Sequence, residues 1–258
     1  MYYSHWENPN KAKDFLQKEN FRKEVTSSGT PILFEGDTVY TIRDRSHTLI
    51  IGATGSGKTQ TQILPRIKLS LLANESVIIN DPKGEIYEQT VKEFQNRNYN
   101  VLVLDYKDAI HGNHFNPLTL AFNLYKEGNH DNCLNVLEEI GYYIFSNPRE
   151  ISDTFWTNSA IDYFTGLCLY LFKTKNSEPN LKDIFDLGNK LKDAKESDKV
   201  LEEVGNSNAI YTYLCGTVTA PLETKGGIIS IFSQKLKSLV CKENLNNMMS
   251  KTDFDIKS

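Results

Sequence analysis

The chain contains one run of residues whose types and spacing are those of a phosphate-binding loop. Residues 52–59 match the pattern G-x-x-x-x-G-K-[ST] at every fixed position. The glycines of this run allow a tight loop whose backbone N–H groups converge on phosphate oxygens. Lys58 is expected to reach the β- and γ-phosphates of a nucleotide, and the Thr59 hydroxyl is expected to bind Mg²⁺. The candidate nucleotide-binding residues are Gly52, Ala53, Thr54, Gly55, Ser56, Gly57, Lys58 and Thr59.

Nucleotide hydrolysis also needs an acidic residue that organises Mg²⁺ and a group that orients the attacking water. Two apolar runs end in an aspartate, Asp81 in one and Asp105 in the other. A proline and a glycine shape a turn after the first run, and this turn could present Asp81, Lys83 and Glu85 to a ligand. The alternatives are that Asp81 caps the helix that follows and that Asp105 is an ordinary residue at the end of a strand.

The candidate site residues lie between segments whose patterns predict alternating strands and helices. Short β-branched and aliphatic runs predict buried strands, and apolar residues three or four positions apart predict helices between them. A two-stranded hairpin is expected at 31–42, ahead of the first buried strand. The alternation implies an α/β core with a parallel sheet and with ligand groups at the carboxyl ends of the strands. The expected buried strands are 48–51, 77–80 and 101–104, and the expected helices are 59–72 and 85–96.

Beyond Leu118 the pattern changes to helical spacing without a convincing strand, over roughly the next hundred residues. One helix is expected to begin near Ser152 or Asp153, which are preferred residue types at a helix N-cap. Its apolar stripe is interpreted as core and not as a cofactor site. Further helices are expected at 181–191, at 199–204 and from Gly226 onward. The stripe consists of Trp156, Ala160, Phe164, Leu167, Cys168 and Leu171.

The sequence therefore predicts four parts. Residues 1–28 form an N-terminal arm, which includes a charged helical run at 11–23. Residues 29–118 form a nucleotide-binding core, and residues 119–218 form an all-α insertion domain. Residues 219–258 are expected to return toward the nucleotide-binding core.

The composition is that of an ordinary globular protein, with 39% hydrophobic and 24% charged residues in 258. A net charge of -4 provides no overall basic field, so nucleic-acid binding would require a local patch or an assembled surface. The four cysteines form no C-x-x-C pair, which argues against a zinc site or a disulfide framework. The most apolar long stretch, 161–172, is too short to span a membrane, and no signal peptide is evident, so we expect a soluble cytoplasmic chain.

Several segments together resemble the coupling-protein ATPases of conjugative type IV secretion, the VirD4/TraG family. The phosphate loop alone is common to many families. The D-P-K-G-E segment at 81–85, followed later by N-P-L at 116–118, makes the resemblance specific. The matching pieces are 52–60, 76–88, 99–105, 115–118, 155–160, 225–236 and 252–255.

This resemblance implies a RecA-like P-loop NTPase core with a parallel sheet and an inserted all-α domain. It implies ATP and Mg²⁺ as cofactors, adds Gln60 to the residues of the loop, and makes Lys58, Asp81, Lys83 and Glu85 the catalytic candidates. Proteins of this kind couple ATP hydrolysis to export of single-stranded DNA with its attached relaxase. The resemblance further implies a hexameric ring, which works with the channel subunits at the cytoplasmic face of the membrane, and a helical domain that recognises the substrate.

The chain departs from the family pattern in two respects. Family members generally begin with transmembrane helices, and none is evident in this sequence. The family also places a Walker B strand that ends in Asp-Glu after the helical insert, and no such strand occurs before Ser258. The arginine finger is expected in the absent part too. These departures predict an N-terminal fragment of a longer ATPase with an incomplete hydrolytic site.

Two other functions stay open at the level of sequence. A small-molecule P-loop kinase would use Asp81 or Asp105 for magnesium and the helical region as an acceptor lid, although no compact arginine-rich lid segment is present. A non-catalytic fragment would dock relaxase or other secretion subunits through its helical region. In that case the nucleotide site would only stabilise the fold.

Overall fold

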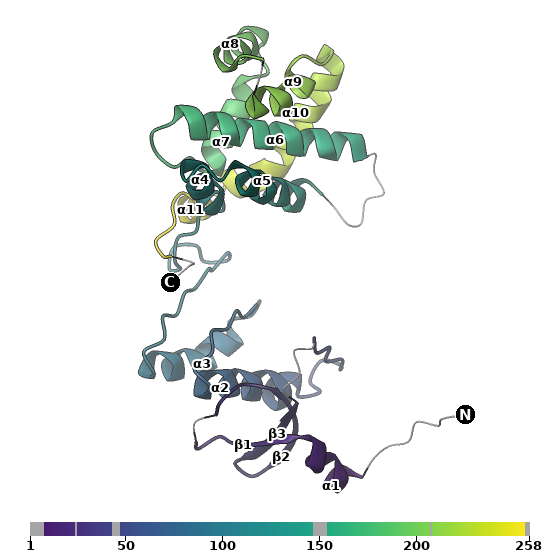
Figure 1. Cartoon of the computed structure of the whole chain (residues 1–258), viewed down its shortest axis with the longest axis vertical. Helices are drawn as coiled ribbons and strands as arrows, with labels where there is room; N and C mark the ends of the chain where they lie inside the picture. Colours follow the sequence, from purple (N-terminus) through teal and green to yellow (C-terminus); the bar gives the residue numbers. More distant parts are fainter. Residues whose placement is uncertain (1–7, 24, 43–46, 147–153, 207, 256–258) are drawn as a thin grey trace, which may run out of the picture. The chain divides into compact units, whose positions relative to one another are not determined.

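A computed structural model describes residues 8–23, 25–42, 47–146, 154–206 and 208–255. The chain forms two compact units, Met1–Val101 and Leu102–Ser258, which are described separately below. The first unit combines a small sheet with helices, and the second is helical (Figure 1). The four-part division expected at residues 28, 118 and 218 stays a prediction.

The first unit contains a three-stranded antiparallel sheet with the strand order β1-β3-β2. Strands β2 and β3 form the hairpin predicted from the sequence, which is thereby confirmed. Gly36 in the connecting turn has φ +61°, a left-handed conformation that glycine adopts without a steric penalty. The strands are β1 (Gln17–Asn20), β2 (Thr30–Glu35) and β3 (Thr38–Ile42).

The helical prediction for 11–23 is only partly correct. Short helical turns occupy α1 (Pro9–Ala12) and η1 (Lys13–Phe15), but the next residues form strand β1. Lys18 of β1 pairs with Tyr40 of β3, and Glu19 pairs with Val39. The free edge of β3 supplies hydrogen-bonding partners, and this tertiary pairing overrides the local helical preference of lysine, glutamate and glutamine. The N-terminal segment therefore belongs to the sheet.

Two helical segments of the first unit confirm the sequence prediction. The residues after the phosphate loop form a π-helical turn, η2 (Thr59–Ile63), which continues directly into α2 (Leu64–Leu72). Helix α3 spans Glu85–Asn96, the same residues as predicted. Two small apolar clusters hold these helices, one formed by Val25, Val39, Leu69 and Leu72 and the other by Ile67, Leu71, Ile86 and Phe94.

The three segments expected as buried strands, 48–51, 77–80 and 101–104, are not strands in this structure. A strand requires a neighbour for its backbone hydrogen bonds, and these segments have no ladder partner among the described residues. Their side chains are largely exposed, with Leu49 at 83% and Ile78 at 104% of the accessible reference area. The structure thus does not show a parallel RecA-like sheet, which stays a prediction.

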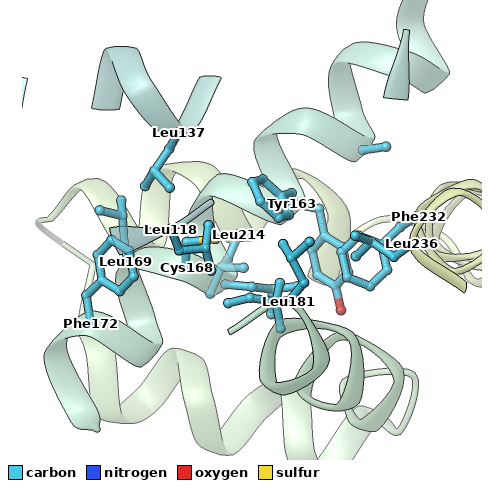
Figure 2. Close-up of a cluster of buried hydrophobic side chains, with 14 of the residues drawn as sticks. Leu118, Leu137, Tyr163, Cys168, Leu169, Phe172, Leu181, Leu214, Phe232 and Leu236 are labelled. Carbon is cyan, nitrogen blue, oxygen red and sulfur yellow. The ribbon is translucent and has the colours of Figure 1, made fainter. Parts of the chain in front are cut away.

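The second unit consists of eight described helices around one apolar cluster. Helix α6 lies in the middle of it and packs against α5, α7, α9 and α10 (Figures 1 and 2). The helices are α4 (Thr119–Lys126), α5 (His130–Phe145), α6 (Thr154–Thr174), α7 (Leu181–Lys190), α8 (Ala194–Val204), α9 (Ala209–Val218), α10 (Leu222–Val240) and α11 (Glu243–Met248).

The stripe predicted to be core lies on α6 and is buried at its centre. Ala160, Phe164, Leu167 and Cys168 have no exposed surface, which confirms this interpretation of the stripe. Helix α6 is described from Thr154 onward, so the expected caps Ser152 and Asp153 lie outside the described residues. The helices predicted at 181–191 and 199–204 correspond to α7 and to the second half of α8.

The region 219–258, which is expected to lead back toward the nucleotide-binding core, contains α10 and α11. Helix α10 packs against α5, α6, α7 and α9. Its residues Ile229, Phe232 and Leu236 are buried in the same cluster as α6. This region is therefore part of the helical unit up to the end of α11.

No helix in the described part of the chain has both the length and the apolar character that crossing a bilayer requires.

Candidate functional site

Residues 52–59 form an exposed loop with two left-handed glycines. Gly55 has φ +80° and Gly57 has φ +82°, a region that other L-residues adopt only with strain. A Cβ atom on Gly52 would lie 2.6 Å from the Ser56 hydroxyl oxygen, which is the end of an exposed side chain. Gly55 and Gly57 are therefore the positions where the backbone of this tight loop favours glycine.

Backbone donors of this loop are available for a ligand. The N–H of Ser56 donates to the Ala53 carbonyl oxygen at 3.2 Å. No acceptor in the described part of the chain takes a hydrogen bond from the N–H groups of Gly55, Gly57 or Lys58. Free N–H groups in a glycine loop ahead of a helix are the usual donors to phosphate oxygens. This arrangement fits a nucleotide polyphosphate.

The Lys58 side chain folds back over the loop. Its ammonium group donates to the carbonyl oxygens of Gly52 at 2.5 Å and Ala53 at 2.9 Å. The loop thus holds a positive charge beside its own free N–H groups, although the contacts are exposed to solvent.

Contacts outside the motif hold both ends of the loop. Downstream, Thr61 donates its N–H to the Gly57 carbonyl oxygen at 2.9 Å, which joins the loop to η2. Upstream, the hydroxyls of Thr30 and Thr48 lie 2.9 Å apart. The Arg66 guanidinium on α2 donates to the same Thr30 oxygen at 2.9 Å. Sequence reasoning missed Thr30, Thr48 and Arg66, because nothing in the local pattern links residues so far apart.

Asp81 acts as a cap in this structure. Its Oδ2 accepts hydrogen bonds from the N–H groups of Ile86 at 2.8 Å and Tyr87 at 2.9 Å, in the first turn of α3. Gly84, with φ +81°, makes the reversal that brings Asp81 to this helix end. The capping alternative for Asp81 is therefore confirmed. Its second carboxylate oxygen takes no part in these two bonds, so a role toward Mg²⁺ stays a prediction.

Lys83 and Glu85 lie on the same turn and are exposed. The Lys83 ammonium lies 3.8 Å from the Glu85 carboxylate, and both side chains are more than half exposed, so the pair contributes little stability. Among the described contacts, no hydrogen bond or ion pair joins Asp81, Lys83 or Glu85 to residues 52–60. Their catalytic assignment stays a prediction.

Asp105 belongs to the second unit and organises its own loop. Its Oδ1 accepts hydrogen bonds from the N–H groups of Lys107 at 2.8 Å and Asp108 at 2.9 Å. These two bonds hold the pKa of Asp105 below its ordinary value, because they stabilise the ionised carboxylate. Asp105 thus shapes the turn that follows it, and since 101–104 is not a strand here, the interpretation of Asp105 as an ordinary strand-end residue and its role toward magnesium both stay predictions.

A surface hollow of about 620 Å³ lies in the helical unit between α5 and α6. It includes none of the residues of the phosphate loop or of the 81–85 turn. Burial and the nearby Glu138 raise the pKa of Asp162 in its lining. The lining residues are Asn135, Glu138, Glu139, Tyr142, Tyr143, Asn158, Ile161 and Asp162. Among the described residues, no group of three or more histidine, cysteine, aspartate or glutamate side chains is placed to hold a metal ion.

The observed features define a mainly helical protein that carries a glycine loop suited to phosphate. The family model described as "Type IV secretory system Conjugative DNA transfer" matches residues 6–258. Because this match covers nearly the whole chain, the protein belongs to that family, and its resemblance to VirD4/TraG-type coupling proteins is confirmed. No curated protein and no solved structure matches the chain.

Proposed function

We propose that this chain binds ATP and Mg²⁺ as part of a motor protein that drives conjugative DNA transfer through a type IV secretion system. Membership of the DNA-transfer family gives the general process. The observation that supports nucleotide binding most directly is the loop at 52–59, which carries both the Lys58 ammonium and unbonded backbone N–H groups. Family membership also favours this function over a small-molecule kinase.

In this proposal each loop group has one task. The N–H groups of Gly55, Gly57 and Lys58 bind phosphate oxygens, and the Lys58 ammonium leaves the Gly52 and Ala53 carbonyls to bind the β- and γ-phosphates. The Thr59 hydroxyl contributes an oxygen ligand to Mg²⁺. Mg²⁺, when bound, would neutralise part of the negative charge of the phosphates. Asp81 holds the start of α3 and offers its remaining oxygen to the same site.

The partners follow from the family in this proposal. Single-stranded DNA and its relaxase are the transported substrates, and the channel subunits of the secretion system receive them. The motor works as a hexamer at the cytoplasmic face of the membrane. The hollow between α5 and α6 supports a docking role for the helical unit, because its exposed tyrosines and carboxylates offer both apolar area and charge.

The test is equilibrium binding of Mg-ATP to the full chain and to Lys58→Ala. We expect the variant to lose at least about tenfold in affinity, because a charge-assisted contact with phosphate contributes about 1.5 kcal/mol or more. Lys92→Ala is the matched control, since Lys92 is an exposed lysine on α3. Equal affinity in all three proteins would show that the Lys58 ammonium does not bind the nucleotide.

A second measurement separates binding from hydrolysis. Steady-state ATP turnover is followed with and without single-stranded DNA, with Lys58→Ala as the blank. Turnover that is lost in the variant would show a complete hydrolytic site within these residues. Binding without turnover would favour the docking alternative or a site that needs further residues. Phosphate transfer to a small acceptor would favour the kinase.

A further inference from the structure

The segment before α4 and the segment after α11 lie side by side at one end of the helical unit (Figure 1). The N–H of Phe115 donates to the carbonyl oxygen of Met248 at 2.9 Å, and the N–H of Asp253 donates to that of His114 at 3.4 Å. These residues are more than 130 positions apart in the sequence. The residues before the first helix of this unit and those after its last described helix thus lie together.

Asn116 lies at the centre of this contact and has no exposed surface. Its amide nitrogen donates to the Pro179 carbonyl oxygen at 2.9 Å and to a Glu178 carboxylate oxygen at 2.6 Å. Its amide oxygen accepts from the N–H of Leu118 at 3.1 Å. Its own backbone N–H donates to the Thr252 hydroxyl at 2.9 Å. One side chain therefore joins the start of α4 to the turn before α7, and its backbone joins both to the segment after α11.

Further polar contacts join the same segments. The hydroxyls of Thr119 and Thr252 lie 2.6 Å apart, and the Thr119 hydroxyl also donates to Glu178. The Asp253 carboxylate accepts from the His114 backbone N–H at 3.1 Å and lies 3.2 Å from the His114 ring nitrogen Nδ1. Of these polar residues Asn116 is buried, whereas Thr119, Thr252 and His114 are partly exposed and Asp253 is exposed. Removing a hydrogen-bonding partner of the buried Asn116 is therefore the costly change, and it affects the segments that Asn116 joins.

Apolar contacts reinforce both segments. The rings of Phe115 and Phe254 stack with centroids 6.1 Å apart. Leu118 lies in the first segment and Met248 in the second, and both are fully buried in the main cluster of the helical unit. The contact is thus continuous with the core and is not an isolated surface pairing.

We propose that residues 113–119, 178–179 and 248–254 form a clasp, in which the segment at the start of α4 is tied to the segment at the end of α11. The clasp opens and closes as one element. The closed clasp makes the helical unit move as a single body when either segment is displaced, because neither segment can separate without breaking the contacts of Asn116 and Thr252. This inference does not depend on nucleotide binding. The motifs N-P-L and T-D-F-D, which the phosphate site does not use, have a common structural role in it.

The test is native-state hydrogen–deuterium exchange on the full chain without nucleotide. Asn116→Ala removes the side-chain bonds to Glu178, Pro179 and Leu118 but keeps the backbone bond to Thr252, whereas Thr252→Val removes the hydroxyl that accepts this backbone bond. We expect either substitution to speed exchange in both 113–119 and 248–254 by roughly 10-fold to 100-fold, the effect of one unsatisfied buried polar group on local opening. Exchange in the middle of α6 should stay unchanged. Thr252→Val keeps the side-chain volume, so it tests the clasp even where Asn116→Ala does not fold.

Asn132→Ala is the control, since Asn132 is exposed on α5 and should leave exchange unaltered in both segments. An effect confined to the substituted segment would overturn the proposal, because the two sides would then open independently. No effect in either segment, or equal acceleration throughout α6, would overturn it as well. Because no nucleotide is present, failure here is distinct from failure of the proposed ATP binding.

Discussion

The hydroxyl of Tyr163 on α6 donates to the carbonyl oxygen of Gly188 on α7 at 2.8 Å, and Phe232 of α10 packs against the same glycine. Tyr163 and Phe232 are both fully buried, with ring centroids 5.2 Å apart (Figure 2). Burial raises the pKa of Tyr163 well above its ordinary value, so the hydroxyl stays protonated as a donor. Helices α6, α7 and α10 thus meet at Gly188, which has no side chain.

Gly188→Ala should destabilise the helical unit. The added Cβ would lie 2.4 Å from Cε1 and 2.6 Å from Cζ of Phe232, whose ring is fully buried. Overpacking of this kind costs about 1–3 kcal/mol, which urea unfolding followed by circular dichroism can measure. Gly216→Ala on α9 is the control, because a Cβ there meets nothing within 4 Å. Equal unfolding midpoints for the two variants would contradict the packing described.

Substitutions of Asp81 should separate its capping role from a role toward magnesium. Asp81→Ala removes the acceptor for two N–H groups of α3 and should cost about 0.5–2 kcal/mol of stability. Asp81→Asn keeps an oxygen acceptor and should keep most of that stability. The two unfolding free energies and the Mg-ATP affinities are compared with those of wild type. If Asp81→Asn keeps the wild-type stability but binds Mg-ATP more weakly than wild type, Asp81 acts on the metal as well as on the helix end.

The four cysteines should react with thiol reagents in two classes. Cys241 is exposed and Cys215 partly so, whereas Cys133 and Cys168 are buried. Burial raises the pKa of Cys133 to about 11 and that of Cys168 well above its ordinary value, which removes the reactive thiolate at neutral pH. A disulfide reagent should therefore titrate Cys241 and Cys215 in the native protein and the other two only in denaturant. Rapid reaction of Cys168 in native protein would contradict the buried core.

The Asp253 contacts should make the helical unit sensitive to acid. Hydrogen bonds from the His114 backbone and ring lower the pKa of Asp253 in the folded state. A lowered pKa contributes stability above the unfolded value, about 3.9, and this contribution is lost as the pH falls through the folded value. Wild type should therefore exceed Asp253→Asn in melting temperature at pH 7, and the difference should shrink below about pH 4. A difference independent of pH would show that the carboxylate charge is not involved.

Local sequence patterns were sufficient for several elements of this protein. Helix α3 begins and ends where its apolar spacing predicted, and the hairpin of β2 and β3 forms around its glycine turn. The tight loop expected at 52–59 also forms, because Gly55 and Gly57 adopt positive φ values. These features depend on residues close in sequence, so their side-chain types and spacing determine them.

Other features were decided only by contacts between distant residues. Strand β1 forms because the edge of β3 offers hydrogen bonds, and the runs at 48–51 and 77–80 lack such a neighbour and are not strands. Asn116 meets Pro179, and its N–H meets the hydroxyl of Thr252, only after the helices pack. A sequence fixes local spacing, but pairing of remote segments depends on which partner the folded chain brings within hydrogen-bonding distance.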